Sequence, residues 1–244
     1  MNSGLYTAFS GLRAEMTALD MASHNLANVN TVGFKEGRAF LTLLNQTLND
    51  QDSSQVGAAV NNQVVLAEGA LNESDGSLLA TGRDLDIALS GSGYLTVQTP
   101  RGLRYTRDGG LAIGRQDFLT TRDGYVLLGE NGPIQLGQGK VRIDEQGSVY
   151  LDGNLMDRLK LVTFNDPRAL QREGAALMAP VSDKMKAVPA QLQVRQGYLE
   201  QSNVNAIAGV VGMVGILRHF EAIQKSVNLL MNEVNAKAID RLGR

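Results

Sequence analysis

The chain has an amphipathic segment at each end, and in both the large apolar residues recur at alternating intervals of three and four. The N-terminal stripe consists of Leu5, Phe9, Leu12, Met16, Leu19, Ser23 and Leu26. The C-terminal stripe consists of Met213, Ile216, Phe220, Ile223, Val227, Leu230 and Val234. This spacing is typical of the seam through which one helix packs against another. Because each large apolar side chain left in water forgoes roughly 1.5–3 kcal/mol, we expect the two terminal helices to need each other or a neighbouring subunit.

The boundaries of the two helices follow from capping residues. The first helix is predicted to run from about Ser3, a favourable N-cap, to Asn28. The second is predicted to begin near Asn203 or Asn205 and to continue almost to Gly243. Three glycines spaced by three lie near its start: Gly209, Gly212 and Gly215. Each weakens an isolated helix by about 1 kcal/mol relative to alanine, but small residues let another helix approach closely. The alternative is that this stretch is irregular.

Residues 84–164 have the pattern of an antiparallel β domain. Strand-like runs occur at 94–97, 111–113, 125–128, 141–143, 148–151 and 159–164. Dipeptides that favour tight hairpin turns separate many of them: Asp108-Gly109, Asp123-Gly124, Asn131-Gly132 and Asp152-Gly153. No helical pattern lies between the strands, so a meander, sandwich or open barrel is predicted rather than a parallel sheet.

The predicted fold class is α+β, with the two terminal helices pairing as a coiled-coil-like layer and with a central antiparallel all-β domain. The predicted parts are 1–40, an N-terminal helix and turn; 41–83, an extended connector; 84–192, the β domain; and 193–244, a return segment and the C-terminal helix. The end of the β domain, from about 165, is expected to be loose because it holds three of the five prolines.

Composition excludes several function classes. The net charge of −2 gives no basic face for nucleic acid, and the absence of cysteine excludes disulfides and cysteine-ligated metals. The longest apolar run, 206–217, is shorter than the roughly 20 residues that cross a bilayer, so no direct membrane insertion is expected. The first nine residues, MNSGLYTAF, lack the basic and apolar regions of a secretion signal. We therefore expect any export to proceed without a cleaved leader.

Candidate catalytic and metal-binding residues are few. His24 and His219 lack a helix neighbour at metal-ligand spacing, and we interpret them as polar positions beside the seams. Asp84 and Asp86 could form a carboxylate pair on one strand face, but a solvated strand edge is the preferred interpretation. Gly91-Ser92-Gly93 lacks the third glycine and following helix of a dinucleotide loop. We expect no enzyme activity, no cofactor and no small-molecule substrate.

The β domain also carries a group of arginines interleaved with aspartates: Arg101, Arg104, Arg107, Arg115 and Arg122. Alternating charge of both signs is typical of an exposed polar surface. We interpret this group as a surface suited to polar contacts between subunits.

Three segments resemble the bacterial flagellar rod and hook proteins. Residues 23–35, SHNLANVNTVGFK, are similar to the end of that family's N-terminal helix and its Thr-x-Gly-Phe-Lys turn, although His24 stands where the family usually has Asn. Residues 196–205, QGYLEQSNVN, resemble the entry to the family's C-terminal helix. The runs at 93–97 and 104–109 resemble its β domain. The resemblance covers nearly the whole chain in the same order.

The resemblance implies a structural subunit of the flagellar basal body, in its periplasmic span. It implies export through the flagellar type III apparatus without a cleaved signal, and assembly with itself and with other rod proteins. The opening LYTAFSGL at 5–12 is most like the proximal-rod member, with the distal rod as the alternative. The expected assembly interface contains the apolar members of both stripes together with Asn25, Asn28, Gly33 and Phe34.

Two unrelated functions compete with this interpretation. One is a coiled-coil adaptor that dimerises through its ends, which would form stable helical dimers in concentrated solution. The other is a β-rich hydrolase acting on cell wall, which would need a convergent carboxylate cleft around Asp84 and Asp86.

Overall fold

A computed structural model describes residues 2–37, 40–43, 64–67, 71–164, 170–174, 176–182 and 185–242. The chain forms two compact units. Unit 1 consists of 1–26, 37–69 and 206–244, and unit 2 consists of 27–36 and 70–205. Much of the predicted connector at 41–83 lies outside the described residues.

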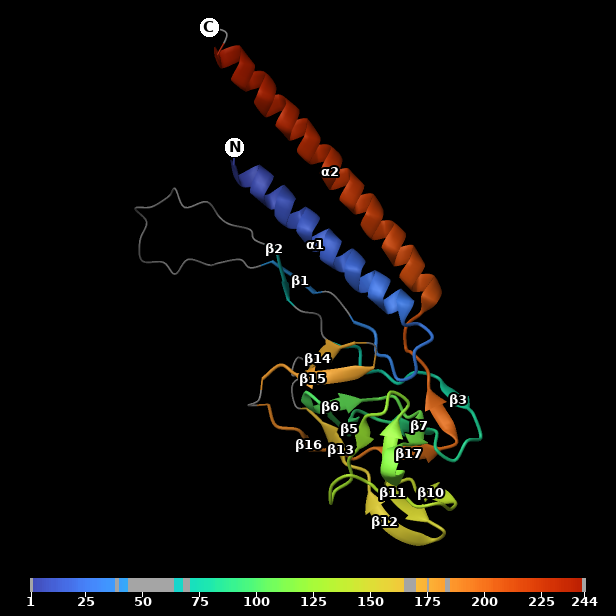
Figure 1. Ribbon diagram of the computed structural model, residues 1–244. Coiled ribbons are helices and arrows are strands. Elements are labelled where there is room, and N and C mark those ends of the chain that lie inside the picture. The colour runs from blue at the N-terminus through green and yellow to red at the C-terminus, as the bar shows by residue number, and fades with distance from the viewer. Residues whose placement is uncertain are drawn as a thin grey trace. The chain divides into compact units, whose positions relative to one another are not determined.

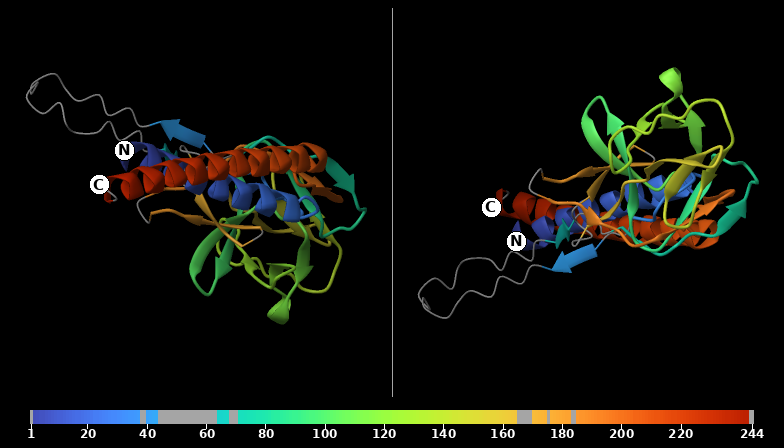
Figure 2. Two further views of the ribbon diagram at one scale, coloured as in Figure 1. Left: turned by 90° about the horizontal axis from the view of Figure 1, so that it is seen from above. Right: turned by 90° about the horizontal axis from the view of Figure 1, so that it is seen from below.

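Unit 1 contains both terminal helices. Helix α1 spans Asn2–Ala27 and α2 spans Ala206–Leu242, within a few residues of the predicted ends. The helices lie side by side and antiparallel (Figures 1 and 2). Two contacts fix the direction: a Cβ on Gly11 would lie 3.7 Å from Ile223 Cδ1, and Glu15 Oε1 lies 3.8 Å from His219 Nδ1. Both predicted terminal helices are therefore present and contact each other, and their coiled-coil-like pairing stays a prediction.

A short hairpin also belongs to unit 1, formed by β1 (Phe40–Leu43) and β2 (Val64–Ala67) in antiparallel register. In α2 the helix continues through Gly209, Gly212 and Gly215, so the irregular alternative is wrong. A Cβ added at any of the three would meet no atom within 4 Å among the described residues. The close approach that these glycines permit is therefore not used within the described part of the chain.

Unit 2 is built on an antiparallel sheet in the order β14-β15-β6-β5-β9-β8-β7, with β13 joining β5 and β16. The bounds are β5 Tyr94–Thr99, β6 Gly102–Thr106, β7 Leu111–Ile113, β8 Leu119–Thr121, β9 Val126–Leu127, β13 Leu161–Thr163, β14 Leu170–Glu173, β15 Leu177–Pro180 and β16 Val188–Pro189. A short 3₁₀ turn, Arg115–Asp117, connects β7 to β8. The stretch predicted to be loose therefore contains β14, β15 and β16.

Three smaller sheets complete unit 2. One has the order β10-β11-β12, one pairs β17 with β4 and one pairs β18 with β3. The bounds are β3 Leu78–Ala80, β4 Ile87–Ser90, β10 Val141–Ile143, β11 Ser148–Leu151, β12 Asn154–Arg158, β17 Gln193–Gln196 and β18 Tyr198–Glu200. Because β17 and β18 pair with strands from the start of the unit, residues just before α2 return to residues about 110 positions earlier.

The turn dipeptides have two different roles. Asp152 and Gly153, with φ angles of 51° and 89°, join β11 to β12 as a tight hairpin, as predicted. Asp108-Gly109 was predicted to form a hairpin, and that prediction is wrong because β6 and β7 pair with other strands. A Cβ at Gly109 would lie 1.8 Å from the Ile87 carbonyl oxygen, so glycine is needed there for close backbone approach.

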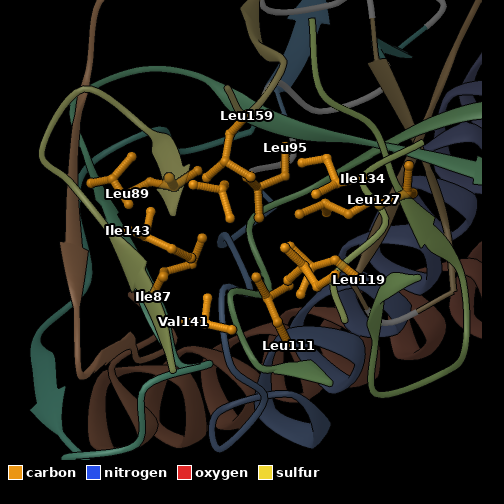
Figure 3. Close-up of a cluster of buried hydrophobic side chains, with 14 residues drawn as sticks. Ile87, Leu89, Leu95, Leu111, Leu119, Leu127, Ile134, Val141, Ile143 and Leu159 are labelled. Atoms are coloured by element: carbon orange, nitrogen blue, oxygen red, sulfur yellow. The ribbon is translucent and has the colours of Figure 1, made fainter. Parts of the chain in front are cut away.

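The core of unit 2 is aliphatic. Side chains from β4, β5, β7, β8, β9, β10, β11 and β17, and from the segments that precede β10 and β13, converge on it (Figure 3). Its fully buried members include Leu95, Leu111, Leu119, Leu127 and Leu159, each at most 2% exposed. A second cluster gathers around Tyr94 and Tyr105, where Phe164 packs edge-on at ring distances of 6.5 and 4.9 Å.

Candidate functional site

The residues considered for catalysis do not converge. His219 is exposed, and its Nδ1 lies 3.8 Å from Glu15 Oε1. Asp84 is exposed, whereas Asp86 is 1% exposed and pairs with Arg122 at 3.3 Å and Arg83 at 3.8 Å. The interpretation of Asp86 as part of a solvated edge is therefore wrong. Within the described residues, no group of three or more histidine and acidic side chains could hold a metal ion.

The predicted stripe of α2 lies on the side that faces α1. Met213, Ile216, Phe220 and Ile223 are half-buried, and Val227 is 8% exposed. Ile223 reaches the α1 backbone at Gly11. The side chains of Leu230 and Val234 lie outside the described residues. For its described part, the stripe is the more buried side of α2.

The stripe of α1 is divided between two surfaces. Its members Leu12, Leu19 and Leu26 are half-buried, whereas Phe9 and Met16 are each 56% exposed; the side chain of Leu5 lies outside the described residues. The side of α1 that meets α2 carries small residues, with Gly11 opposite Ile223 and Ala14 only 5% exposed. Small residues allow close helix approach, so the large side chains Phe9 and Met16 remain open for another partner.

A second apolar face runs along the first half of α2. It repeats at helical spacing and consists of Ile207, Val210, Val211, Val214 and Leu217, which are 80, 47, 67, 44 and 41% exposed. Contiguous exposed apolar patches mark interaction surfaces. By length and composition alone, Ala206–Leu229 is also long and apolar enough to cross a membrane. These five residues form what we call the open face of α2.

The turn after α1 belongs to unit 2. The amide of Gly33 donates to the Glu200 carbonyl at 2.8 Å, and Phe34 is 1% exposed. Gly33 has a φ of +67°, and a Cβ there would lie 2.4 Å from the backbone of Arg107. Thr31 donates to the Asn28 side chain at 3.1 Å, which closes the turn. Of the predicted interface residues, Gly33 and Phe34 therefore contact the chain's own β unit.

Asn25 makes two hydrogen bonds within unit 1. Its side-chain nitrogen Nδ2 donates to the Gly37 carbonyl at 2.8 Å, and its side-chain oxygen Oδ1 accepts from the Gly37 backbone amide at 2.9 Å. This reciprocal pair brings the chain back toward the last turn of α1. The assembly role predicted for Asn25, Asn28, Gly33 and Phe34 stays a prediction.

Beside the turn lies an ion cluster, which we define as Lys35, Arg107 and Glu200. Lys35 Nζ lies 2.5 Å from Glu200 Oε1, and Arg107 Nη1 lies 2.9 Å from Glu200 Oε2. The three side chains are 1, 2 and 0% exposed. Burial lowers the pKa of Lys35, the Arg107 charge lowers it further, and the hydrogen bond to Glu200 opposes both. Removing Glu200 would leave both buried cations without this partner, and the loss of one partner from a buried ion pair costs about 3–5 kcal/mol.

Two further groups hold the segment that carries Lys35. The guanidinium of Arg172 lies 4.2 Å from the Phe34 ring centroid and donates to the Lys35 carbonyl. Burial lowers the pKa of Arg172 to about 10, so the group is still charged at neutral pH. Asn203 accepts from the Glu36 amide at 2.7 Å and donates to the Ser74 carbonyl at 2.9 Å.

Sequence reasoning missed the ion cluster. It assigned Arg107 to an exposed polar surface, which is wrong because Arg107 is 3% exposed. Arg101 and Arg104 do lie nearer the surface, where both pair with Glu173. A signal was available, since Lys35, Arg107 and Glu200 fall one each in the three segments that carry the family resemblance.

Comparison with known proteins matches the same three regions. Residues 5–35 match the family described as flagella basal body rod protein. Residues 88–151 match the D1 domain of the flagellar hook protein FlgE/F/G family, and residues 195–229 match the C-terminal family of flagellar basal body rod FlgEFG proteins.

Individual relatives align over the full chain. The sequence is 33% identical over 250 residues to the flagellar basal-body rod protein FlgF of Rhizobium meliloti, covering all of this chain and 99% of the relative. It is 28% identical over 248 residues to FlgF of Caulobacter vibrioides, with the same coverage. It is 30% identical over 263 residues to the rod protein FlgG of Bacillus subtilis, covering 97% of this chain and all of the relative.

Proposed function

Because the chain belongs to the flagellar basal-body rod protein family, with a structural role in the rod, we propose that it is a proximal-rod subunit that polymerises through its terminal helices. The observation that carries the proposal is the apolar surface that one chain leaves uncovered on both helices. Phe9 and Met16 on α1, and the face from Ile207 to Leu217 on α2, are large side chains at helical spacing. Their burial against neighbouring copies supplies the driving force for a filament.

The seam residues have complementary tasks in this proposal. Within one chain the α2 stripe around Phe220 and Ile223 pairs with α1 in a coiled-coil-like manner, and Leu12 and Leu19 lie at the edge of that contact. Phe9 and Met16, together with the second face of α2, contact the helices of neighbouring subunits. The helices of a free subunit are then only partly stabilised, and polymerisation completes them.

The remaining features of the function are inferred from the family. The subunit passes through the flagellar type III export apparatus without a cleaved signal and assembles in the periplasmic span with other rod proteins. It acts as part of the torque-transmitting shaft and catalyses no reaction. The alternative within the family is the distal rod, because relatives named FlgF and FlgG align with the chain at similar identity.

The experiment that tests the role is electron cryo-tomography of flagellar motors in cells that lack this gene. We expect rings and export gate without a complete rod or filament, with restoration by the intact gene as the control. The position at which axial density ends distinguishes the proximal from the distal rod. An intact rod, hook and filament in cells without any duplicate gene would refute the assignment.

The open face of α2 has a competing occupant, because Ala206–Leu229 is long and apolar enough to enter a bilayer. Flotation of the purified protein with phosphatidylglycerol–phosphatidylethanolamine vesicles separates the two. We expect the protein to remain at the bottom of the gradient, because the charged residues Arg218, Glu221 and Lys225 interrupt the apolar sequence of α2 beyond its open face. Stable flotation that resists high salt would favour insertion over packing between subunits.

A further inference from the structure

The ion cluster joins parts of the chain that are far apart in sequence. Lys35 and Glu200 are separated by 165 positions, and Arg107 and Glu200 by 93. Lys35 directly follows the turn at which α1 ends, and Glu200 lies a few residues before α2 begins. The hydrogen bonds of this cluster can form only after the β unit has brought its first and last segments together.

Glu200 accepts more hydrogen bonds than a single buried ion pair would provide. Both oxygens of Glu200 are used, because Oε1 accepts from Lys35 and from the Gly76 amide at 2.9 Å while Oε2 accepts from Arg107 at 2.9 Å. Asp75, half-exposed at 47%, lies 3.4 Å from Arg107 and supplies a second negative charge. Directional bonds of this kind favour a single position of the turn within unit 2, whereas an apolar contact would tolerate several positions.

A second set of bonds ties the same two segments. Asn203 accepts from the Glu36 amide at 2.7 Å, its own amide donates to the Phe34 carbonyl at 3.3 Å, and its side chain donates to the Asn72 carbonyl at 2.8 Å. The Gly33 amide donates to the Glu200 carbonyl. The segment 31–36 therefore lies alongside 200–203 with defined register over several residues.

We propose that Lys35, Arg107 and Glu200 act as a latch that fixes, within the β unit, the position at which α1 ends and the position from which α2 begins. A subunit with the latch closed presents residues 27 and 205 at set positions, and only such a subunit adds to the rod. The latch stays closed in the assembled state. This inference rests on the proposed function and assigns positioning residues to it; these residues need not touch a neighbouring subunit.

The first test is Lys35→Met, which removes one cation and leaves Glu200 paired with Arg107, so the core of the β unit is retained. In the isolated protein, we expect amide hydrogen exchange at Gly33 to accelerate at least about tenfold. Exchange at the Leu119 amide, which donates to Ile134 inside the unit, is expected to stay unchanged. In cells, we expect at least about tenfold fewer complete rods.

The matched control is Glu173→Gln, which removes the partner of Arg101 and Arg104 elsewhere in the same unit. It should leave both the exchange at Gly33 and the number of rods unchanged. Normal rod assembly by Lys35→Met, or unchanged exchange at Gly33, would overturn the proposal. A loss of rods in Glu173→Gln equal to that in Lys35→Met would also overturn it, because the effect would then follow from any lost ion pair.

A rescue experiment distinguishes positioning from general stability. The chain has no cysteine of its own, so Glu36→Cys with Asn203→Cys introduces a single possible disulfide. This bond would join the segment 31–36 to the segment 200–203 beside the latch. Oxidised after export, this bond should restore rod assembly to Lys35→Met, and dithiothreitol in the medium should abolish the rescue. Thiol labelling of the recovered subunits verifies the redox state.

If the oxidised bond fails to restore rod assembly to Lys35→Met, the latch is refuted. The loss of rods in Lys35→Met would still support the proposed function as a rod subunit. The oxidised bond can also be placed in the chain that retains Lys35. If it blocks rod assembly there, the proposal is refuted, because assembly would then require the latch to open. If deletion of the gene leaves the rod intact, the proposed function itself fails, and that result is independent of the latch variants.

Discussion

The two units of this chain cover their apolar residues to different degrees. In unit 2 the aliphatic core, with Leu111 and Leu119 as examples, is shielded completely within one chain. In unit 1 the helix pair leaves Phe9 more than half exposed and Ile207 almost fully exposed. A protein domain that folds alone does not leave apolar residues uncovered at regular helical spacing. The core of the β unit is therefore closed within a single chain, whereas the proposed function assigns the uncovered faces of the helix pair to neighbouring subunits.

The polar groups show the same contrast. In the described part of unit 2 the buried charged side chains are paired, and the pair of Lys35 with Glu200 connects distant segments. In the described part of unit 1, His219 and Glu15 lie 3.8 Å apart, which is long for an ion pair, and the histidine side chain is 76% exposed. Exposed pairs contribute about 0–1 kcal/mol. Specific polar bonds thus define the β unit, whereas apolar contact dominates the helix pair.

The largest expected effect comes from breaking the helix pair. Phe220→Asp places a charge in the stripe that faces α1, and we expect at least about tenfold fewer complete rods by tomography. Urea unfolding of the β unit should change by less than about 0.5 kcal/mol. Gln224→Asp, an exposed position one turn further on, is the matched control and should assemble normally. Normal incorporation of Phe220→Asp would contradict the proposed seam.

Leu119→Ala tests the other side of the comparison. Leu119 is fully buried in the core of unit 2, so its truncation should lower the free energy of unfolding by about 2–5 kcal/mol, measured by urea denaturation. Leu155→Ala, at a position 63% exposed in the same unit, should change it by less than about 1 kcal/mol. Equal losses in the two variants would show that the β unit is not a self-contained core.

The same contrast explains what could be predicted from the sequence. Both helices were predictable because the apolar period of α1 and α2 persists over many turns, and capping residues placed their ends to within a few residues. The strands at 94–97 and 141–143 were predictable because short apolar runs stand between turn residues. These are local signals, and each is read from a few neighbouring residues.

Long-range contacts could not be predicted in this way. The side of α1 that meets α2 includes Gly11 and Ala14, which contribute little to an apolar pattern, so the pattern gave more weight to Phe9. The role of Gly109 depends on the Ile87 carbonyl, and that of Arg107 on Glu200. In both cases the decisive neighbour is brought close by the fold, and a single sequence does not identify it.

A pH-dependent prediction concerns Tyr94, which lies in the second cluster of unit 2. Burial raises the pKa of Tyr94 to about 12, from 10 in an unfolded chain. Between these values the unfolded state loses the proton first, so stability falls as pH rises. From neutral pH to pH 11 this amounts to about 1.4 kcal/mol. Between pH 8 and pH 11, the free energy of unfolding of Tyr94→Phe, measured by urea denaturation, should fall by about 1.4 kcal/mol less than that of the unaltered protein. Parallel losses in the two proteins would contradict the assigned cause.

The smallest effect returns to the helix pair. A Cβ at Gly11 would lie 3.7 Å from Ile223 Cδ1, which is ordinary van der Waals contact, so alanine fits there without displacing α2. Because alanine favours the helix by about 1 kcal/mol over glycine, Gly11→Ala should raise the helical content of the free subunit, measured by circular dichroism. Gly212→Ala, where no described atom lies within 4 Å, provides the comparison. If both variants gain helix but only Gly212→Ala loses rod assembly, the glycines of α2 are kept for a neighbour's approach. If Gly11→Ala instead loses helix, α1 and α2 are packed more tightly than an incomplete pair would be, and the contrast between the two units weakens.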